Sequence, residues 1–141
     1  MSFEPREEIR NLIAQVDRFM EEHIFQYELR HWDFVDDGKN QFQYPPWFEG
    51  LKAKAREAGI WNWFLNKEYE EFSPGLSNLD FAPIMERMAR VPWAQEVFNC
   101  SAPDRGNMEV LARFGSRYQQ DTWLKPLDRK STRLNSSHSS V

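Results

Sequence analysis

The feature that most constrains the fold is a stripe of large apolar side chains near the amino terminus. From Glu4 onward these side chains recur at steps of three and four residues: Ile9, Leu12, Ile13, Val16, Phe19, Met20, Ile24 and Tyr27. That period places them on one face of an amphipathic helix. Ser2 is a candidate N-cap for this helix, and Pro5 suits its first turn. The sequence therefore predicts a long first helix with one buried face.

The segment 32–46 loses the helical period and predicts a loop. Its turn-forming residues are Asp36, Asp37, Gly38 and Asn40, followed by the rigid pair Pro45 and Pro46. A second helix is predicted from about Pro46 to Ala58, with Gly59 available for the left-handed position after its end. Its buried face is expected to consist of Trp47, Leu51, Ala55 and Ala58.

The next part of the chain combines an aromatic connection with a capped helix. The segment 60–72 is rich in aromatic residues but irregular, so we expect an extended, packed connection there. Ser77 and Asp80 have the spacing of a capping box, which predicts a helix that ends near Arg90. Because Pro83 removes a backbone donor, we expect a kink or a 3₁₀ start near Phe81.

The last ordered part is predicted to hold three short helices. These are a helix over 92–99, a helix over 107–114 that Gly115 closes, and a helix that Ser116 and Gln119 cap and Pro126 ends. A polar loop is expected over 100–106. No segment predicts a strand with conviction, so the expected fold class is all-α, with a bundle-like arrangement of helices.

Composition excludes several classes of function. The chain has 141 residues, a formal net charge of -4 and a sequence pI near 5.4, which disfavours nucleic-acid binding. Its single cysteine allows no internal disulfide and too few thiolates for a zinc site, and it favours a reducing compartment. We see no targeting signal and no membrane span, and expect a cytoplasmic protein if bacterial, or a mitochondrial or peroxisomal one if eukaryotic.

The carboxyl-terminal segment 128–141 differs from the rest of the chain. It contains no aromatic residue, little apolar material and a run of serines, which predicts a disordered tail. Residues 128–138 (DRKSTRLNSSH) also resemble one translated reading frame of a common sequencing-library adapter. We therefore expect a native domain over 1–127, a non-native tail over 128–141, and a native continuation that is missing.

The polar residues predict no catalytic or metal site of their own. The histidines His23, His31 and His138 are scattered and form no metal-binding pattern. With Gly38 at the sixth position of a calcium loop, Val35 and Tyr44 would stand at the third and twelfth positions, where ligands are required. Cys100 lacks a downstream histidine base outside the adapter-like tail, and the isolated glycines form no phosphate loop. A set of aromatic side chains is expected in the core, with an apolar ligand slot as the alternative: Trp61, Trp63, Phe64, Trp93 and Phe98.

Three segments resemble one known family. They are Leu51–Leu65 (LKAKAREAGIWNWFL), Gly75–Pro83 (GLSNLDFAP) and Pro92–Phe114 (PWAQEVFNCSAPDRGNMEVLARF). Together they resemble the amino-terminal domain of acyl-CoA dehydrogenases, in the branch of the long-chain members ten and eleven. The likeness spans nearly all of Phe3–Leu127. The chain departs from the family pattern at three places. Leu65-Asn66 stands where the family usually has Leu-Pro, Tyr69-Glu70-Glu71 where it has Tyr-Gly-Gly, and Ala89 where it has a glycine.

The resemblance implies an all-α amino-terminal domain, truncated before a middle β domain of a fatty-acid-oxidising flavoenzyme. Such enzymes oxidise acyl-CoA to 2-enoyl-CoA with FAD, use electron-transfer flavoprotein as the acceptor, and form homo-oligomers. The catalytic glutamate and the flavin contacts are expected beyond Leu127, so the fragment alone is expected to be inactive. The alternative is a stand-alone helical module that binds lipid or protein without flavin.

The resemblance also implies one set of substrate-binding residues. They match the loop and helix start beside the acyl chain in the family: Phe98, Asn99, Cys100, Ser101, Ala102, Pro103, Asp104, Gly106, Asn107 and Met108. A wall of this kind needs apolar groups to bury methylenes, at about 0.8 kcal/mol each. The small residues Ala102 and Gly106 would set how much acyl chain fits.

Overall fold

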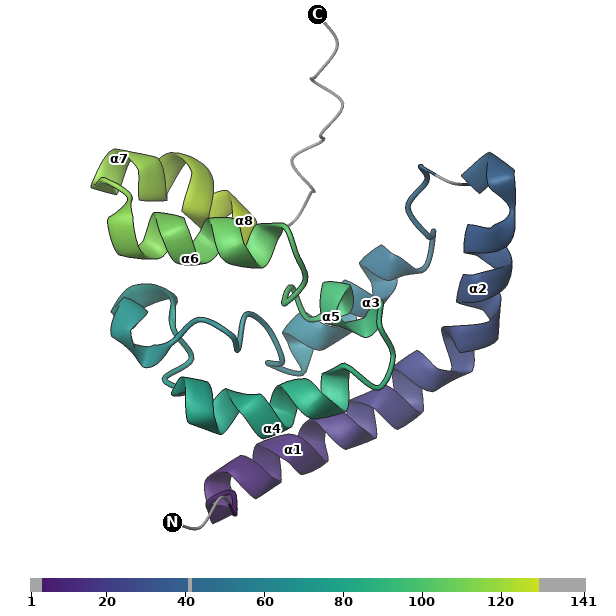
Figure 1. Ribbon diagram of the computed structural model, residues 1–141, viewed down its shortest axis with the longest axis horizontal. Helices are drawn as coiled ribbons and strands as arrows, with labels where there is room; N and C mark the ends of the chain where they lie inside the picture. Colours follow the sequence, from purple (N-terminus) through teal and green to yellow (C-terminus); the bar gives the residue numbers. More distant parts are fainter. Residues whose placement is uncertain (1–3, 41, 130–141) are drawn as a thin grey trace, which may run out of the picture.

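A computed structural model describes residues 4–40 and 42–129 of the chain, and within these ranges the fold is all-α, as predicted. Helix α1 (Glu7–Phe19) lies along α4 (Asn78–Met88) at one side of the molecule (Figure 1). The helices α6 (Asp104–Phe114), α7 (Arg117–Gln119) and α8 (Lys125–Arg129) form a hairpin at another side. The short helices α3 (Phe48–Glu57) and α5 (Ala94–Val97) lie between these two groups.

The first helix buries its stripe as predicted, but it is not one regular helix. Ile9, Val16 and Phe19 are buried in α1, and Arg6 stands at the N-cap position without a side-chain cap. The predicted cap Ser2 lies outside the described residues. After Phe19 the chain continues through a π-helical segment, η1 (Met20–Ile24), and a 3₁₀ turn, η2 (Phe25–Tyr27).

The loop predicted over 32–46 is wrong in its first part, because α2 (Glu28–Asp36) continues the helix through it. His31 anchors α2: its ring stacks on Phe48 at 5.5 Å and on Trp93 at 4.8 Å between ring centroids. The apolar residues Trp32 and Val35 are 44% and 43% exposed. Since α2 buries only His31, its sequence does not show the apolar stripe of a buried helix face. The short 3₁₀ turn η3 (Gly38–Asn40) then begins the remaining loop.

Helix α3 and the connection after it follow the prediction closely. Leu51 and Ala55 are buried and Gly59 has a φ of +72°, whereas Ala58 is exposed, contrary to expectation. The aromatic connection is packed and irregular until it forms the 3₁₀ segment η4 (Lys67–Phe72).

Both predicted capping boxes are present. Ser77 Oγ accepts from the Asp80 backbone N–H at 3.1 Å and opens α4. Phe81 N–H donates to Ser77 O in α-helical register, so the expected 3₁₀ start is wrong. Pro83 is tolerated inside α4, where its missing donor would have paired with the carbonyl of Leu79, a residue that is 72% exposed.

The carboxyl-terminal hairpin corrects two predicted boundaries. Helix α6 begins at Asp104, so the polar loop predicted over 100–106 ends three residues early. Ser116 and Gln119 cap α7, but the helix does not end at Pro126: a π-helical segment, η5 (Gln120–Leu124), leads into α8. Pro126 is the second residue of α8, inside a helical run that is continuous from α7. Helix α8 reaches two residues past the domain boundary expected at Leu127.

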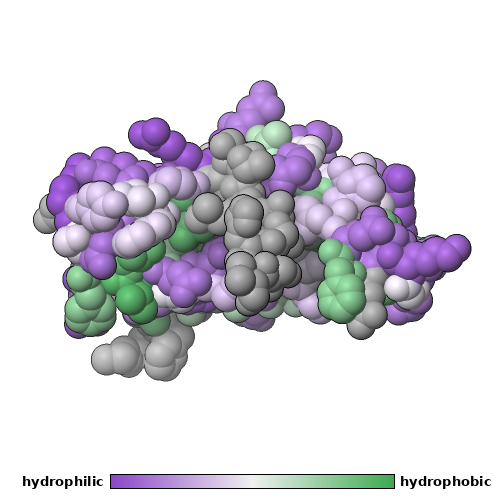
Figure 2. All heavy atoms as spheres, turned by 90° about the horizontal axis from the view of Figure 1, so that it is seen from above, coloured by the Kyte–Doolittle hydropathy of each residue, from purple (hydrophilic) through white to green (hydrophobic). Residues whose placement is uncertain are grey.

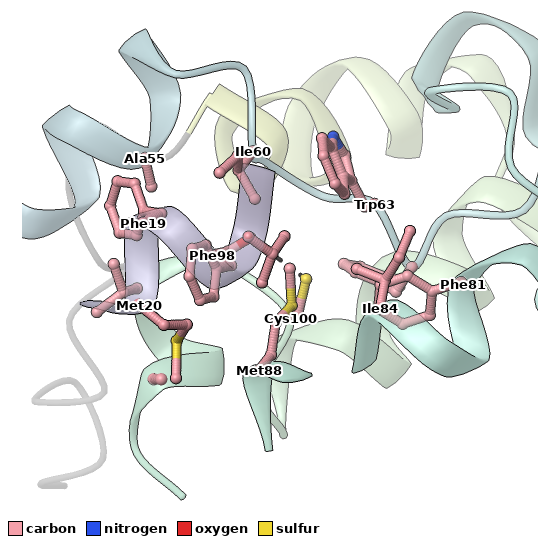
Figure 3. Packing of buried hydrophobic residues seen from close by; sticks show 14 of the residues in the cluster. Phe19, Met20, Ala55, Ile60, Trp63, Phe81, Ile84, Met88, Phe98 and Cys100 are labelled. Carbon is pink, nitrogen blue, oxygen red and sulfur yellow. Dashed lines mark hydrogen bonds between the residues drawn. The ribbon is translucent and has the colours of Figure 1, made fainter. Parts of the chain in front are cut away.

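One apolar core joins these elements. Figure 3 shows Phe98 pointing toward Phe19, with their ring centroids 5.2 Å apart, and Cys100 among the same buried residues. The aromatic residues Trp63, Phe64, Trp93 and Phe98 are buried, as expected for core packing, whereas Trp61 is only partly buried against the core.

The core also encloses a charged side chain that the sequence did not predict. Lys52 is 1% exposed, and its Nζ donates to Glu96 Oε1 at 2.8 Å and to the hydroxyl of Tyr44. The Tyr44 hydroxyl in turn donates to Glu96 Oε1 at 2.5 Å. Because buried charges are costly unless they are paired, this cluster fixes α3 against α5 and the loop before α3.

Candidate functional site

The residues implied as an acyl wall form one continuous segment at the junction of α5 and α6, and the structure divides them by burial. Four are buried: Phe98, Asn99, Cys100 and Met108. Four are exposed: Ala102, Pro103, Gly106 and Asn107. Ser101 and Asp104 are intermediate. The segment therefore has a buried floor and a small-residue surface above it.

The exposed part lies where the loop enters α6. The peptide bond between Ala102 and Pro103 is cis, and Pro103 stands at the N-cap position of α6. A Cβ added at Gly106 would meet no atom within 4 Å. The surface over Ala102, Pro103 and Gly106 is thus low and open, which leaves room for a ligand against it.

In the buried part Asn99, which the resemblance implied as a wall residue, pairs with Asn62, which the sequence did not single out. Asn99 Nδ2 donates to Asn62 Oδ1 at 2.6 Å and to the backbone carbonyl of Leu127 at 3.1 Å. Both asparagines have a left-handed backbone, with φ of +57° at Asn62 and +55° at Asn99. The only local signal was the residue type, because asparagine tolerates this conformation better than other non-glycine residues.

Cys100 is a structural thiol in this arrangement. It is 1% exposed, and its Sγ lies 3.3 Å from the carbonyl oxygen of Phe98. Burial raises the pKa of Cys100 to about 12, so the reactive thiolate is suppressed. This agrees with the absence of a base in the sequence around it.

The structure also shows pockets away from this segment. A groove of about 420 Å³ lies between the start of α1 and α4 and is lined in part by Ile9, Leu79 and Pro83. An open hollow of about 460 Å³ lies between α1, η1 and α3, beside Phe19 and His23. The proposed wall residues line neither of them.

Within the described ranges, no group of three or more His, Cys, Asp or Glu residues is placed to hold a metal ion. His31 is held in the aromatic stack, and burial lowers its pKa. His138 lies outside the described residues. Over the same ranges, no helix has both the length and the apolar character needed to cross a membrane.

Comparison with known proteins decides the family. The sequence model described as "Acyl-CoA dehydrogenase, N-terminal domain" matches residues 6–130. The chain belongs to the acyl-CoA dehydrogenase family, as its amino-terminal domain. The match covers α1 to α8, so the resemblance seen in three segments extends over the whole described fold.

Individual relatives agree with this assignment. The chain is 38% identical over 125 residues to acyl-CoA dehydrogenase family member 10 of Mus musculus, and 37% identical over 121 residues to family member 11 of Homo sapiens. It is 40% identical to a solved structure from Mycobacterium abscessus that is described as an acyl-CoA dehydrogenase, with a TM-score of 0.80.

These matches cover most of this chain but a small part of each relative. The first two alignments cover 84% of this chain, and 11% and 15% of the relatives. The structural match covers 92% of this chain and 33% of the solved one. The chain therefore corresponds to one domain of longer proteins.

Proposed function

We propose that this chain supplies one wall of the acyl pocket and a domain interface in an FAD-dependent acyl-CoA dehydrogenase. The proposal rests on the surface at the α5–α6 junction, in a domain that belongs to this family. Its exposed small residues, Ala102, Pro103 and Gly106, stand over a floor that contains Phe98 and Met108. Such a surface can bury methylenes at about 0.8 kcal/mol each.

The parent enzyme would oxidise acyl-CoA to 2-enoyl-CoA in fatty acid oxidation, with electron-transfer flavoprotein as the acceptor, and would assemble as a homo-oligomer. FAD would supply the hydride acceptor for this reaction. We assign none of the described residues to FAD, because they include no glycine-rich phosphate loop and the glycines are isolated. This chain's own residues would orient the acyl chain and exclude water from it.

The proposal is tested by re-sequencing the gene downstream of the codon for Leu127 and purifying the protein that it encodes. We expect bound flavin that acyl-CoA bleaches, whereas the 141-residue chain retains no flavin and oxidises no acyl-CoA. Gly106→Leu should shift the preference toward shorter acyl chains, because the added side chain narrows the wall at a position where a Cβ meets no atom within 4 Å. Flavin-free protein, or an unchanged chain-length profile, would contradict the proposal.

The second candidate is a stand-alone helical module that binds lipid or protein without flavin. The groove between α1 and α4 favours it, since Ile9, Leu79 and Pro83 give that groove an apolar lining. A serine-rich tail that is genuinely encoded and followed by a stop codon would support this candidate over the first.

A further inference from the structure

The loop between α5 and α6 is fastened to the end of α8 through one side chain, Asn99. We propose that Asn62 and Asn99 are positioning residues that couple the proposed acyl wall to the Leu127–Asp128 peptide near the end of α8. That this segment is a wall of an acyl pocket rests on the proposed function. The coupling itself is tested without substrate or flavin, so the two can fail separately.

The backbone brings the two asparagines face to face. Both adopt the left-handed conformation, which is uncommon for a residue with a side chain. The Asn62 backbone N–H also donates to the carbonyl of Phe98 at 3.2 Å, directly before Asn99. Two uncommon backbone conformations thus meet at one side-chain hydrogen bond of 2.6 Å.

The Leu127–Asp128 peptide is held through its backbone carbonyls, which accept hydrogen bonds from side-chain donors. Asn99 Nδ2 donates to Leu127 O at 3.1 Å, while Trp61 Nε1 donates to Asp128 O at 2.7 Å. Asn62 Nδ2 contacts the same carbonyl at 3.3 Å and also donates to the Asp128 carboxylate at 2.7 Å. Carbonyls at the end of a helix lack partners within it, so these donors satisfy a need of α8. The backbone bonds do not depend on which side chain stands at position 128.

The same side chain reaches both ends of the wall. Asn99 stands next to Cys100 in the loop, and its Nδ2 lies 3.7 Å from Met108 Sδ in α6. A displacement of the Leu127 carbonyl would therefore move Asn99, which stands near the start of the wall segment and contacts Met108 at its end.

Stability alone does not explain this pair. Asn99 Oδ1 is buried and has no hydrogen-bond partner among the described residues. An unsatisfied buried acceptor is costly, so it offsets part of the stability that the hydrogen bonds of this pair supply. A role in fixing direction explains why a polar group with a specific geometry stands here.

Cys100 provides the test, because it is the only cysteine in the chain and is buried beside Asn99. A thiol reagent such as 5,5′-dithiobis(2-nitrobenzoate) can label it only when the loop opens. Labelling rates of the full chain in native buffer therefore report the opening of the wall, and urea unfolding of the same samples reports global stability.

Two pairs of variants separate coupling from local effects. Asn99→Gly keeps the left-handed backbone and removes the donor, whereas Asn99→Ala also strains the backbone. Trp61→Phe removes the bond to Asp128 O and keeps an aromatic ring beside the Arg56 guanidinium, which lies 4.7 Å from the Trp61 ring centroid. Trp63→Phe is its control, since Trp63 Nε1 donates at 2.9 Å to Gly59 O and not to Leu127 or Asp128.

We expect Asn99→Gly to speed Cys100 labelling about tenfold or more, as two hydrogen bonds are lost. Trp61→Phe should speed it several-fold, and Trp63→Phe should not once rates are compared at equal global stability. Wild-type labelling of Asn99→Gly would show that the backbone alone holds the loop and would overturn the proposal. Equal effects of Trp61→Phe and Trp63→Phe would overturn it as well, and this comparison stands even if Asn99→Gly does not fold.

Discussion

Helices α4 and α6 have the same length but are attached to the molecule in different ways. Each has 11 residues, yet α4 buries Phe81, Ile84 and Met88, whereas α6 buries only Met108. The hairpin that contains α6 relies more on directional contacts, from Asn99 to Leu127 O and from Arg117 to Glu71. Apolar burial therefore contributes most to the attachment of α4, whereas in the hairpin hydrogen bonds and charges supplement the buried Met108, Leu124 and Leu127.

The surface reflects the same difference. Figure 2 shows green apolar groups at the end of the molecule that carries α6 and α7, and a second green group in the half that carries α2. Exposed apolar residues of the hairpin include Val110, Phe114 and Tyr118, at 58%, 74% and 71%. A face of this kind is typical of an interaction surface, so we expect the isolated chain to self-associate.

The largest effect should come from truncating the apolar contact of α4. Ile84 is fully buried, so Ile84→Ala should lower the free energy of unfolding by about 2–5 kcal/mol. Leu79→Ala, on the same helix but 72% exposed, is the control and should change it by less than about 0.5 kcal/mol. Urea unfolding followed by circular dichroism measures both, and similar losses in the two variants would contradict the contrast.

The hairpin should be most sensitive at its turn. A Cβ at Gly115 would lie 2.5 Å from the carbonyl oxygen of Leu111, a backbone atom that cannot move freely. Gly115→Ala should therefore destabilise the chain by about 1–3 kcal/mol. Gly50→Ala, inside α3 and with nothing within 4 Å, should instead stabilise it by up to about 1 kcal/mol. Thermal melts that move in the same direction would refute this prediction.

Acid should loosen α2 at a milder pH than the rest of the fold. Burial lowers the pKa of His31 from its usual 6.5, so the neutral ring is favoured in the stack with Phe48 and Trp93. This contribution to stability is complete above pH 6.5 and is lost as the pH falls below it. Hydrogen exchange of α2 amides between pH 7.5 and 5.5 measures the effect, and His31→Phe should remove the pH dependence.

The smallest effect should come from the exposed charges that join the hairpin to η4. Arg117 holds the pKa of Glu71 below its usual range through a hydrogen bond, with Lys125 adding to the effect. Stability from this carboxylate is present above pH 4.5 and is lost as the pH falls through its lowered pKa. Glu71→Gln should weaken the chain slightly at low salt and not at high salt. A salt-independent loss would indicate packing rather than charge.

The sequence predicted those features whose cause is local. The capping boxes at Ser77 and Ser116 and the left-handed Gly59 each depend on a few neighbouring residues, and all are present. The exposed continuation of α2 was missed because an unburied helix face leaves no apolar period. Lys52 was missed because only its partners in other elements make burial tolerable.

The candidate site was predictable only in part for the same reason. Its segment came from a resemblance, and its small exposed residues could be named from the sequence. The Asn62–Asn99 contact joins residues 37 positions apart, so no local pattern predicts it. The division of the segment into floor and surface likewise depends on what packs behind Phe98 and Met108.

The two π-helical segments have a consequence for how this domain can change. In each, the chain winds more widely than an α-helix, as when the Phe25 N–H donates to Met20 O. Such a turn holds one residue more than regular winding requires, so deleting that residue would restore α-helical winding and leave the direction of the downstream helix nearly unchanged. A single codon at either place can thus be gained or lost without a change of fold, and relatives with and without it should superpose on both sides of the π-helical turn.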